Sequence, residues 1–299
     1  MDGRAVGTVW LPISMSERLG VRKTYKLFVG GAFPRSESGR SYPVHGSDGQ
    51  LLAYAAQASR KDLRDAIVAA RRAVPGWSGA TAYNRGQVLY RVAELLEGRA
   101  AQFTAEVAAA EGVSSERAAE IVEAAIDRWV WYAGWSDKLA QVAGAANPVA
   151  GPYFNFSVPE PTGVVCMLAP PESSLLGLVS VVAPVIVTGN TAVVVASEPY
   201  PLPAVTLAEV LATSDVPPGV VNVLTGRVTE LAPVAASHRD VNAIDLTGAP
   251  DADRAALERA AAGNLKRVYH GDEEWEEPPG TGRLLATVEV KTVWHPVGI

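Results

Sequence analysis

The sequence GVVCMLAP occupies residues 163–170 and TAVVVASE occupies residues 191–198, and each is an apolar run without polar alternation. Runs of this kind are typical of strands that are buried on both faces of a parallel sheet. Three similar runs follow, and segments long enough to form helices separate all five. We therefore predict an α/β fold in which a five-stranded parallel sheet carries flanking helices, with strands at Gly163–Ala169, Thr191–Val195, Val220–Leu224, Asn242–Leu246 and Leu265–Tyr269.

Open parallel sheets bind ligands beyond the carboxyl ends of their strands. The residues at four of the predicted ends are candidates for ligand contact: Pro170, Glu198, Gly226 and Gly248. No G-x-G-x-x-G motif follows the first strand, so the spacing alone leaves the ligand open.

Composition excludes several classes of function. The 299 residues carry a net charge of −6 and no cluster of Lys and Arg, which argues against a nucleic-acid partner. No stretch approaches the roughly 18 apolar residues of a membrane helix, and the N-terminus lacks the pattern of a signal peptide. The single cysteine, Cys166, excludes an internal disulfide and fits a cytoplasmic location, and the four scattered histidines predict no metal site.

The residues before the sheet form two predicted parts, an N-terminal arm at 1–24 and a region of strands and helices at 25–144. Ser59 and Asp62 have the spacing of a helix capping box, and Pro75-Gly76 is expected to end that helix. The remaining predictions here are strands at Lys26–Gly30 and Tyr42–Ala58, helices from Asn84 through Val107, and one long helix at Ser114–Ala143 whose Trp129 packs in the core.

Two segments outside the sheet suggest assembly. Residues 145–162 alternate aromatic and turn residues as a projecting hairpin would, and residues 163–270 form the α/β unit. Residues 271–282 contain five acidic residues with proline and glycine, which predicts a solvated linker. Residues 283–299 are the last predicted part, and within them Arg283–His295 alternates as a strand that has no neighbour in sequence. Such a strand needs a sheet edge to join, and another subunit can supply one.

The motifs of the predicted sheet resemble the cofactor domain of the NAD(P)-dependent aldehyde dehydrogenases. They occur in the order and spacing of that family: Gly163-Val-Val-Cys with Pro170, Ala183-Pro184, Gly189-Asn190-Thr191, Pro217-Pro218-Gly219-Val220-Val221-Asn222, Gly226 and Leu246-Thr247-Gly248. The resemblance implies a Rossmann-like sheet, with the 145–162 hairpin and Val290–Trp294 as the small β element through which the family oligomerises.

In complete members of the family, the catalytic domain lies between the fifth strand and the C-terminal strand. Here the acidic linker takes that place, as in the incomplete second unit of the family-sixteen aldehyde dehydrogenases. The resemblance implies that the nucleophilic cysteine is absent with that domain. Cys166 is expected to be a buried structural thiol, and Glu172 matches the family's oxyanion-binding asparagine, where a carboxylate would oppose catalysis.

The cofactor positions are altered as well. By resemblance, Val195 replaces the lysine that meets the adenosine ribose, while Glu198 keeps the accompanying glutamate. Val228 replaces a glycine near the adenosine, Ala249 replaces a serine that meets the pyrophosphate, and Asp253 replaces a helix glycine. These losses imply that no tight cofactor is expected, whereas weak NAD(P) binding remains open.

Three hypotheses follow. The first is a non-catalytic subunit, a pseudoenzyme, that forms homo-oligomers or hetero-oligomers with a complete aldehyde dehydrogenase through Arg283–His295 and the 145–162 hairpin. The second is an NAD(P)-dependent oxidoreductase with an altered site, in which Glu172 or the linker acids Asp272, Glu273 and Glu274 act as base. The third is a sensor for a nucleotide or another small ligand, because Gly226, Gly248 and Glu198 persist.

Overall fold

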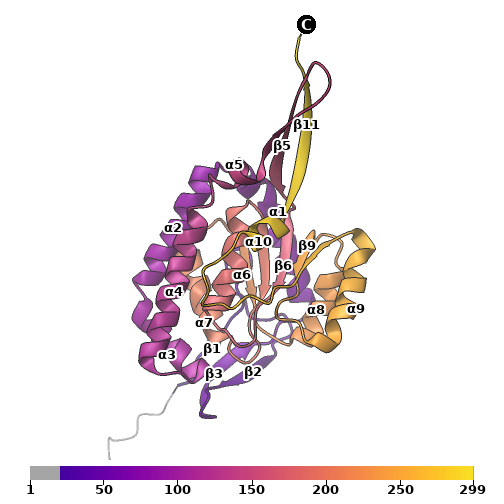
Figure 1. The fold of residues 1–299 in the computed structure, drawn as a ribbon. Coiled ribbons are helices and arrows are strands. Elements are labelled where there is room, and N and C mark those ends of the chain that lie inside the picture. The colour runs from indigo at the N-terminus through magenta and orange to yellow at the C-terminus, as the bar shows by residue number, and fades with distance from the viewer. Residues whose placement is uncertain (1–20, 299) are drawn as a thin grey trace, which may run out of the picture.

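A five-stranded parallel sheet forms the centre of the molecule in the computed structural model, which describes residues 21–298 (Figure 1). Its strand order is β10-β9-β6-β7-β8, and every neighbouring pair is parallel. The five predicted strands are thereby confirmed, some of them one or two residues shorter: β6 Val164–Leu168, β7 Thr191–Val195, β8 Val221–Leu224, β9 Ala243–Asp245 and β10 Arg267–Tyr269.

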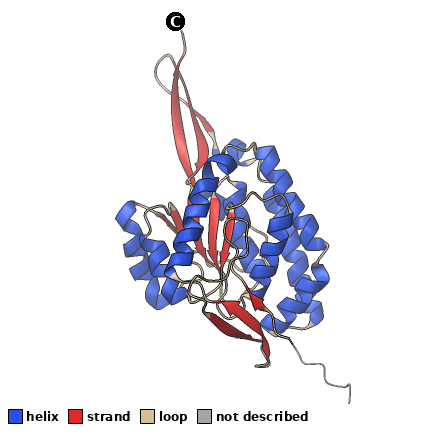
Figure 2. Ribbon diagram, turned by 180° about the vertical axis from the view of Figure 1, so that it is seen from behind, coloured by secondary structure: helices blue, strands red, loops and turns tan. Residues whose placement is uncertain are grey.

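Helices cover both faces of this sheet, as its uninterrupted apolar strands require (Figure 2). Alternate residues of β6 face opposite ways, because Val165 and Met167 lie in one apolar cluster and Val164 and Leu168 in the other. The first cluster is completed by α2 (Ala82–Glu97), α3 (Ala100–Glu111), α4 (Ser115–Ala133), α6 (Leu176–Val187) and α7 (Leu202–Thr213). The second is completed by α1 (Arg60–Ser78), α8 (Val228–Ser237) and α9 (Asp251–Ala261), which the 3-10 turn Ala262–Asn264 follows.

Helix α1 begins with the predicted capping box. The Ser59 hydroxyl accepts from the amides of Lys61 and Asp62, and the Asp62 carboxylate accepts from the Ser59 amide at 2.8 Å. The prediction that Pro75-Gly76 ends the helix was wrong, since α1 continues to Ser78 and Gly79 caps it. Burial of Trp77, whose indole N–H donates to the carbonyl of Ile186 at 2.8 Å, holds this last turn against the body.

The N-terminal strands differ from their predictions. Tyr42–Ala58 is a hairpin of two strands, β2 (Ser41–His45) and β3 (Leu51–Ala56), because Gly46 and Gly49 allow a turn between them. The short β1 (Thr24–Tyr25) pairs with β3, whereas Lys26–Gly30 makes only isolated bridges, one of them between Phe28 and Val223 of β8. Of the predicted arm at 1–24, residues 1–20 lie outside the described part of the chain.

The long helix predicted for Ser114–Ala143 is interrupted. It forms α4, which Gly134 caps, and after a series of turns the short α5 (Leu139–Ala143). Trp129 is fully buried on α4, as its helical spacing predicted. No helix within residues 21–298 combines the length and the apolar character needed to cross a membrane.

Three antiparallel strands form an arm that projects from the body (Figures 1 and 2). We call these strands, β4 (Ala145–Asn147), β5 (Tyr153–Pro161) and β11 (Val288–Pro296), the arm. All nine residues of β11 pair with β5, so the sheet edge that this strand needs is supplied within its own chain. The strand also starts later than predicted, because Arg283 belongs to the short helix α10 (Gly282–Ala286).

Candidate functional site

The fold brings the predicted ligand-contact residues to one edge of the central sheet. Pro170 follows β6, Glu198 follows β7, Gly226 follows β8 and Gly248 follows β9, all at carboxyl ends. We call this the carboxyl edge. In parallel sheets it is the edge at which ligands bind, so its contacts decide what this chain can hold there.

Both glycines of the carboxyl edge are packed against the protein's own backbone. A Cβ atom on Gly248 would lie 2.0 Å from the carbonyl oxygen of Ala169, and its amide donates to the Leu168 carbonyl at 2.9 Å. Gly226 has a φ of +149°, and a Cβ atom there would lie 3.0 Å from the amide nitrogen of Ala58. These close approaches explain why glycine is needed at each position, without any contact to a ligand.

The carboxylate of Glu198 is engaged within the protein. One oxygen pairs with the Arg227 guanidinium at 2.5 Å, and the other accepts from the Val228 amide at 3.1 Å. That amide belongs to the first turn of α8, where a helix would otherwise present its donors to an anionic ligand. Glu198 therefore occupies the place of such a ligand at α8.

The first turn of α9 carries two acidic residues, and one of them, Asp251, pairs with Arg254 at 3.1 Å. Asp251 and Asp253 both lie in it, and Ala249 just before the helix is buried. A carboxylate in the first turn stabilises the helix dipole but repels a phosphate at the same position. Val195 is buried at the end of β7 and supplies no charge to the carboxyl edge. Neither Val195 nor Ala249 thus brings a cation or a hydroxyl to this edge.

The two residues considered for catalysis lie in different surroundings. Cys166 is buried in the middle of β6 between Val193 and Ile244, and burial raises the pKa of its thiol to about 12. Such a thiol is neutral near pH 7 and a poor nucleophile. Glu172 is exposed beyond β6, where it accepts a hydrogen bond from the Trp275 indole at 3.0 Å.

A buried cluster around Arg283 was not foreseen from the sequence. The Arg283 guanidinium pairs with Asp245 of β9 and with Glu273 at 2.7 Å, and it donates to the Thr247 hydroxyl at 3.0 Å. Burial alone would lower the pKa of Arg283, but the neighbouring carboxylates raise it. Asp245 was the available signal, because an acid that ends an apolar strand needs a cation when buried.

Residues 271–282, here called the strap, are anchored to the body through their backbone, while the acidic side chains of the segment stay exposed to solvent. The buried Arg128 of α4 donates to the backbone carbonyls of Trp275 and Glu277 at 2.7 and 3.0 Å, and to the Ser180 hydroxyl at 2.8 Å. The Trp275 side chain packs against the first apolar cluster. Backbone carbonyls of the strap replace water around the Arg128 cation, which is why an acidic segment becomes ordered.

These features meet in a cavity of about 450 Å³ beneath the strap, lined in part by Arg128, Tyr132, Tyr269 and Trp275. Within residues 21–298, no group of three His, Cys, Asp or Glu side chains is arranged to hold a metal ion. The region provides packing and paired charges, and the Tyr269 hydroxyl donates to the Glu273 carboxylate there at 2.6 Å.

Comparison with known proteins supplies the family. The profile described as "Aldehyde dehydrogenase family" matches residues 34–270. This chain belongs to the aldehyde dehydrogenase family. Human retinal dehydrogenase 2 is 32% identical over 251 residues, and cytosolic aldehyde dehydrogenase 1 of Elephantulus edwardii is 31% identical over 248 residues. These alignments cover 82% and 81% of this chain but only 48% and 49% of the relatives.

Solved aldehyde dehydrogenase structures agree with the fold. An NAD+ complex of the Bacillus cereus enzyme superposes with a TM-score of 0.78 at 26% identity, covering 82% of this chain and 50% of that one. HpcC from Thermus thermophilus gives 0.77 at 29% identity and covers 82% and 47%. The Rossmann-like α/β fold is thereby shown, and the chain spans about half the length of the family members it matches.

Proposed function

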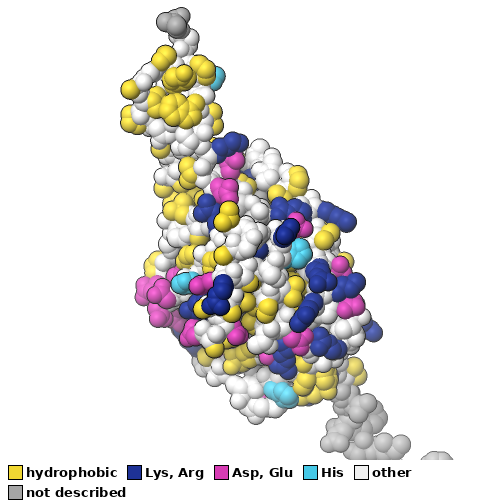
Figure 3. Space-filling view, turned by 90° about the vertical axis from the view of Figure 1, so that its right-hand side faces the viewer, with side chains coloured by type: hydrophobic (Ala, Val, Ile, Leu, Met, Phe, Trp, Pro, Cys, Tyr) yellow, Lys and Arg dark blue, Asp and Glu magenta, His cyan; other side chains and the backbone are white. Residues whose placement is uncertain are grey.

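We propose that this chain is a non-catalytic, aldehyde-dehydrogenase-like subunit that oligomerises through its arm, either with itself or with a complete NAD(P)-dependent member of the family. The observation that carries the proposal is the arm itself, a projecting sheet with apolar side chains on its surface. Figure 3 shows hydrophobic side chains gathered along it, and the exposed apolar residues of its strands include Tyr153, Phe154, Val290 and Trp294.

The arm has the properties of an association surface. Trp294 is 59% exposed, although its ring meets the Tyr153 ring edge-on at 5.7 Å. In the sheet order β11-β5-β4, the outer edge of β11 has no strand beside it within residues 21–298. An exposed edge with apolar side chains is costly for a monomer and is stabilised when another chain covers it.

Two residues of the α/β part of the chain support a non-catalytic role. Cys166 is a buried neutral thiol, and Glu198 is bound to Arg227 and the start of α8. Covalent catalysis on an aldehyde requires an accessible thiolate and donors for the oxyanion, and Glu172 offers a carboxylate instead of a donor. A single buried cysteine also fits a reducing compartment such as the cytoplasm.

Size-exclusion chromatography with light scattering tests the assembly. The wild-type chain should elute with the mass of more than one chain, alone or after mixing with a complete aldehyde dehydrogenase from the same cells. The variant Phe154→Ala/Trp294→Ala should be monomeric in both cases, because it removes apolar area from the arm. The matched control Tyr83→Ala/Tyr90→Ala removes two exposed aromatic side chains from α2 and should assemble normally. Equal masses for the wild-type chain and the arm variant would refute the proposal.

Weak NAD(P) binding is the second candidate function, favoured because a structure of the same fold is an NAD+ complex. Loss of a cation and the added carboxylates should leave millimolar rather than micromolar affinity, since one or two charge-assisted contacts at about 1.5–3 kcal/mol each are missing. Quenching of tryptophan fluorescence by NADH measures the affinity. Appearance of NADH absorbance with aldehyde and NAD, from the chain without companions, would instead support the altered-site oxidoreductase.

A further inference from the structure

A pocket of about 270 Å³ lies beside the N-terminal strands and shares no lining residue with the carboxyl edge. Its lining includes three cations and no carboxylate, on a chain whose net charge is −6. Four residues with hydroxyl groups accompany these cations. The charged and hydroxyl residues of this N-terminal pocket are Lys26, Arg35, Arg40, Thr24, Tyr25, Ser36 and Ser41.

Two of the three cations are available to a ligand. Lys26 and Arg35 are exposed, and neither forms an ion pair with another residue in the 21–298 range. Arg40 pairs with Glu230 at 3.0 Å, so its charge is balanced while part of its guanidinium still lines the pocket. Among the described residues, the pocket therefore holds about two positive charges that no carboxylate pairs with, which favours a ligand of charge near −2.

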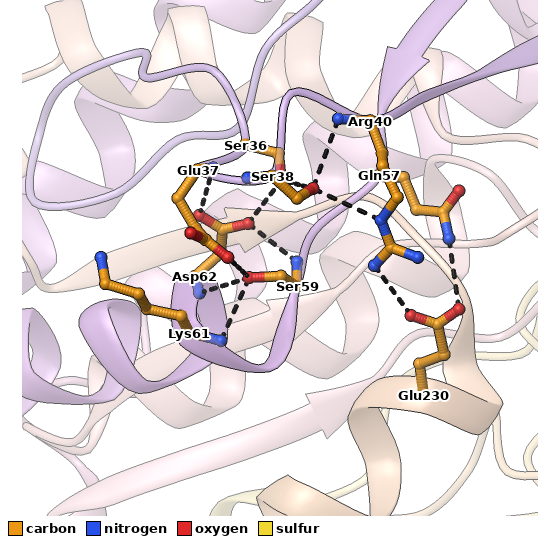
Figure 4. Close-up of polar contacts among 9 residues, drawn as sticks. All are labelled: Ser36, Glu37, Ser38, Arg40, Gln57, Ser59, Lys61, Asp62 and Glu230. Carbon is orange, nitrogen blue, oxygen red and sulfur yellow. Dashed lines mark hydrogen bonds and ion pairs between the residues drawn. The ribbon is translucent and has the colours of Figure 1, made fainter.

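The loop that forms one wall is fixed in place (Figure 4). The Ser36 hydroxyl donates to Asp62 at 2.7 Å, and the Glu37 amide donates to the same carboxylate at 3.1 Å. Asp62 also belongs to the capping box of α1, so the loop is tied to a helix start. Glu37 does not line the pocket, because its carboxylate accepts from the Ser59 hydroxyl at 2.8 Å.

Hydrogen bonds and an ion pair also fix the position of Arg40. Glu230 binds it from the first turn of α8 and also accepts from the Gln57 amide at 3.2 Å, as Figure 4 shows. The Arg40 backbone amide and Nε both lie within hydrogen-bonding distance of the Ser38 hydroxyl, at 3.3 and 3.4 Å. A guanidinium that is already positioned loses little freedom when a ligand binds.

We propose that the N-terminal pocket binds a small soluble molecule that carries a phosphate monoester. The phosphate is contacted by Lys26 and Arg35, with Arg40 and the hydroxyls of Thr24 and Ser41 beside them. Arginine and lysine with nearby hydroxyls are the side chains that bind phosphate in proteins. The volume is slightly below the roughly 300–1,000 Å³ of pockets for drug-sized ligands, which limits the ligand to about the size of a phosphorylated three- to five-carbon compound.

Isothermal titration calorimetry with the full chain tests this proposal, using glycerol 3-phosphate and ribose 5-phosphate as probes at low ionic strength. Binding should be saturable with one site per chain, and Lys26→Gln/Arg35→Gln should weaken it by about tenfold or more for each cation removed. The matched control Arg72→Gln/Arg259→Gln removes the same charge from positions on α1 and α9 and should change the affinity less than twofold. Thermal unfolding of each variant confirms that it is folded.

Equal loss of affinity in the pocket variant and in the control would overturn the proposal, because it would show only general charge attraction. Failure of both probes to bind the wild-type chain would also overturn it. Vesicles of phosphatidylcholine with phosphatidic acid test whether the phosphate belongs to a lipid headgroup. Binding to these vesicles without binding to either soluble probe would contradict a soluble ligand. Binding of the probes does not depend on the oligomeric state. The arm variant Phe154→Ala/Trp294→Ala should therefore bind them as the wild-type chain does.

Discussion

Arg283 shows how much one buried side chain can control. Its guanidinium is 6% exposed and contacts Asp245, Thr247 and Glu273, while its face covers the rings of Tyr269 and Trp275 at 4.9 and 5.3 Å. It lies only five residues before β11, so the same residue fixes the strap and the start of the arm. Charges buried in this way are retained only when each has its partner.

Arg283→Ala is expected to destabilise the fold strongly. Removing the cation leaves the Asp245 carboxylate buried with hydrogen bonds from Thr247 but without a cationic partner, which should lower the free energy of unfolding by about 3–5 kcal/mol. Urea denaturation followed by circular dichroism measures this loss. The control Arg91→Ala removes an exposed arginine that pairs with Glu94 on α2 and should cost less than about 1 kcal/mol. Similar costs for the two variants would contradict the role of burial.

Cys166 predicts a specific dependence of stability on pH. Burial raises its thiol pKa from 9.0 to about 12, so the unfolded chain releases this proton at a lower pH than the folded chain. Its contribution is complete below pH 9 and is lost as pH rises toward 12, at about 1.4 kcal/mol per pH unit. Comparing wild-type and Cys166→Ala stability between about pH 8 and 10 isolates this loss, because the tyrosines are common to both proteins. A thiol reagent that labels the folded chain rapidly near pH 8 would contradict the burial.

At the scale of the element, α1 and β11 illustrate two ways of fixing a segment. Helix α1 is fixed locally, by a capping box and by apolar residues at helical spacing such as Leu63, Ala66, Ile67 and Ala70. Strand β11 is fixed by a partner far away in the sequence, because all its residues pair with β5. Local sequence therefore predicts the start of α1 well but cannot specify the pairing of β11.

Ser59→Ala is expected to weaken the start of α1. The variant removes the acceptor for the Lys61 and Asp62 amides and should cost about 0.5–2 kcal/mol. It should also loosen the 36–38 loop, since Glu37 binds the Ser59 hydroxyl. Hydrogen exchange of the first-turn amides reads out the local effect. Ser59→Thr retains both the acceptor and the hydroxyl donor to Glu37 and should recover most of the stability, and failure to do so would argue against capping as the cause.

At the scale of the whole molecule, an α/β body of the aldehyde dehydrogenase family carries a projecting arm. The body buries its own sheet on both faces, whereas the arm exposes apolar side chains and an open edge. Stability of the body is therefore a property of the single chain. Stability of the arm is expected to depend on its neighbours.

The thermal midpoint should consequently depend on concentration. If the arm is covered in an oligomer, a roughly hundredfold increase in protein concentration shifts the equilibrium toward the assembled folded state and raises the midpoint by a few degrees. Differential scanning calorimetry of wild-type chain and Phe154→Ala/Trp294→Ala makes the comparison. The arm variant should show a midpoint that does not change with concentration, and a concentration-dependent midpoint in both proteins would place the interface elsewhere.

The sequence by itself determined the order of the central strands along the chain, the capping box at Ser59 and the presence of a projecting hairpin at 145–162. These depend on residue periodicity and on contacts between residues close in sequence, which a single segment encodes. One prediction from local sequence was wrong. Helix α1 does not end at Pro75, because burial of Trp77 outweighs the helix break that proline and glycine favour.

Only the tertiary structure decided that β11 pairs with β5 of the same chain, that Arg283 meets Asp245, and that Glu198 is already bound by Arg227. It also decided that backbone carbonyls of the acidic strap are held by Arg128. Each of these joins residues distant in sequence, and their free energy comes from burying charges and edges that no single segment can bury alone.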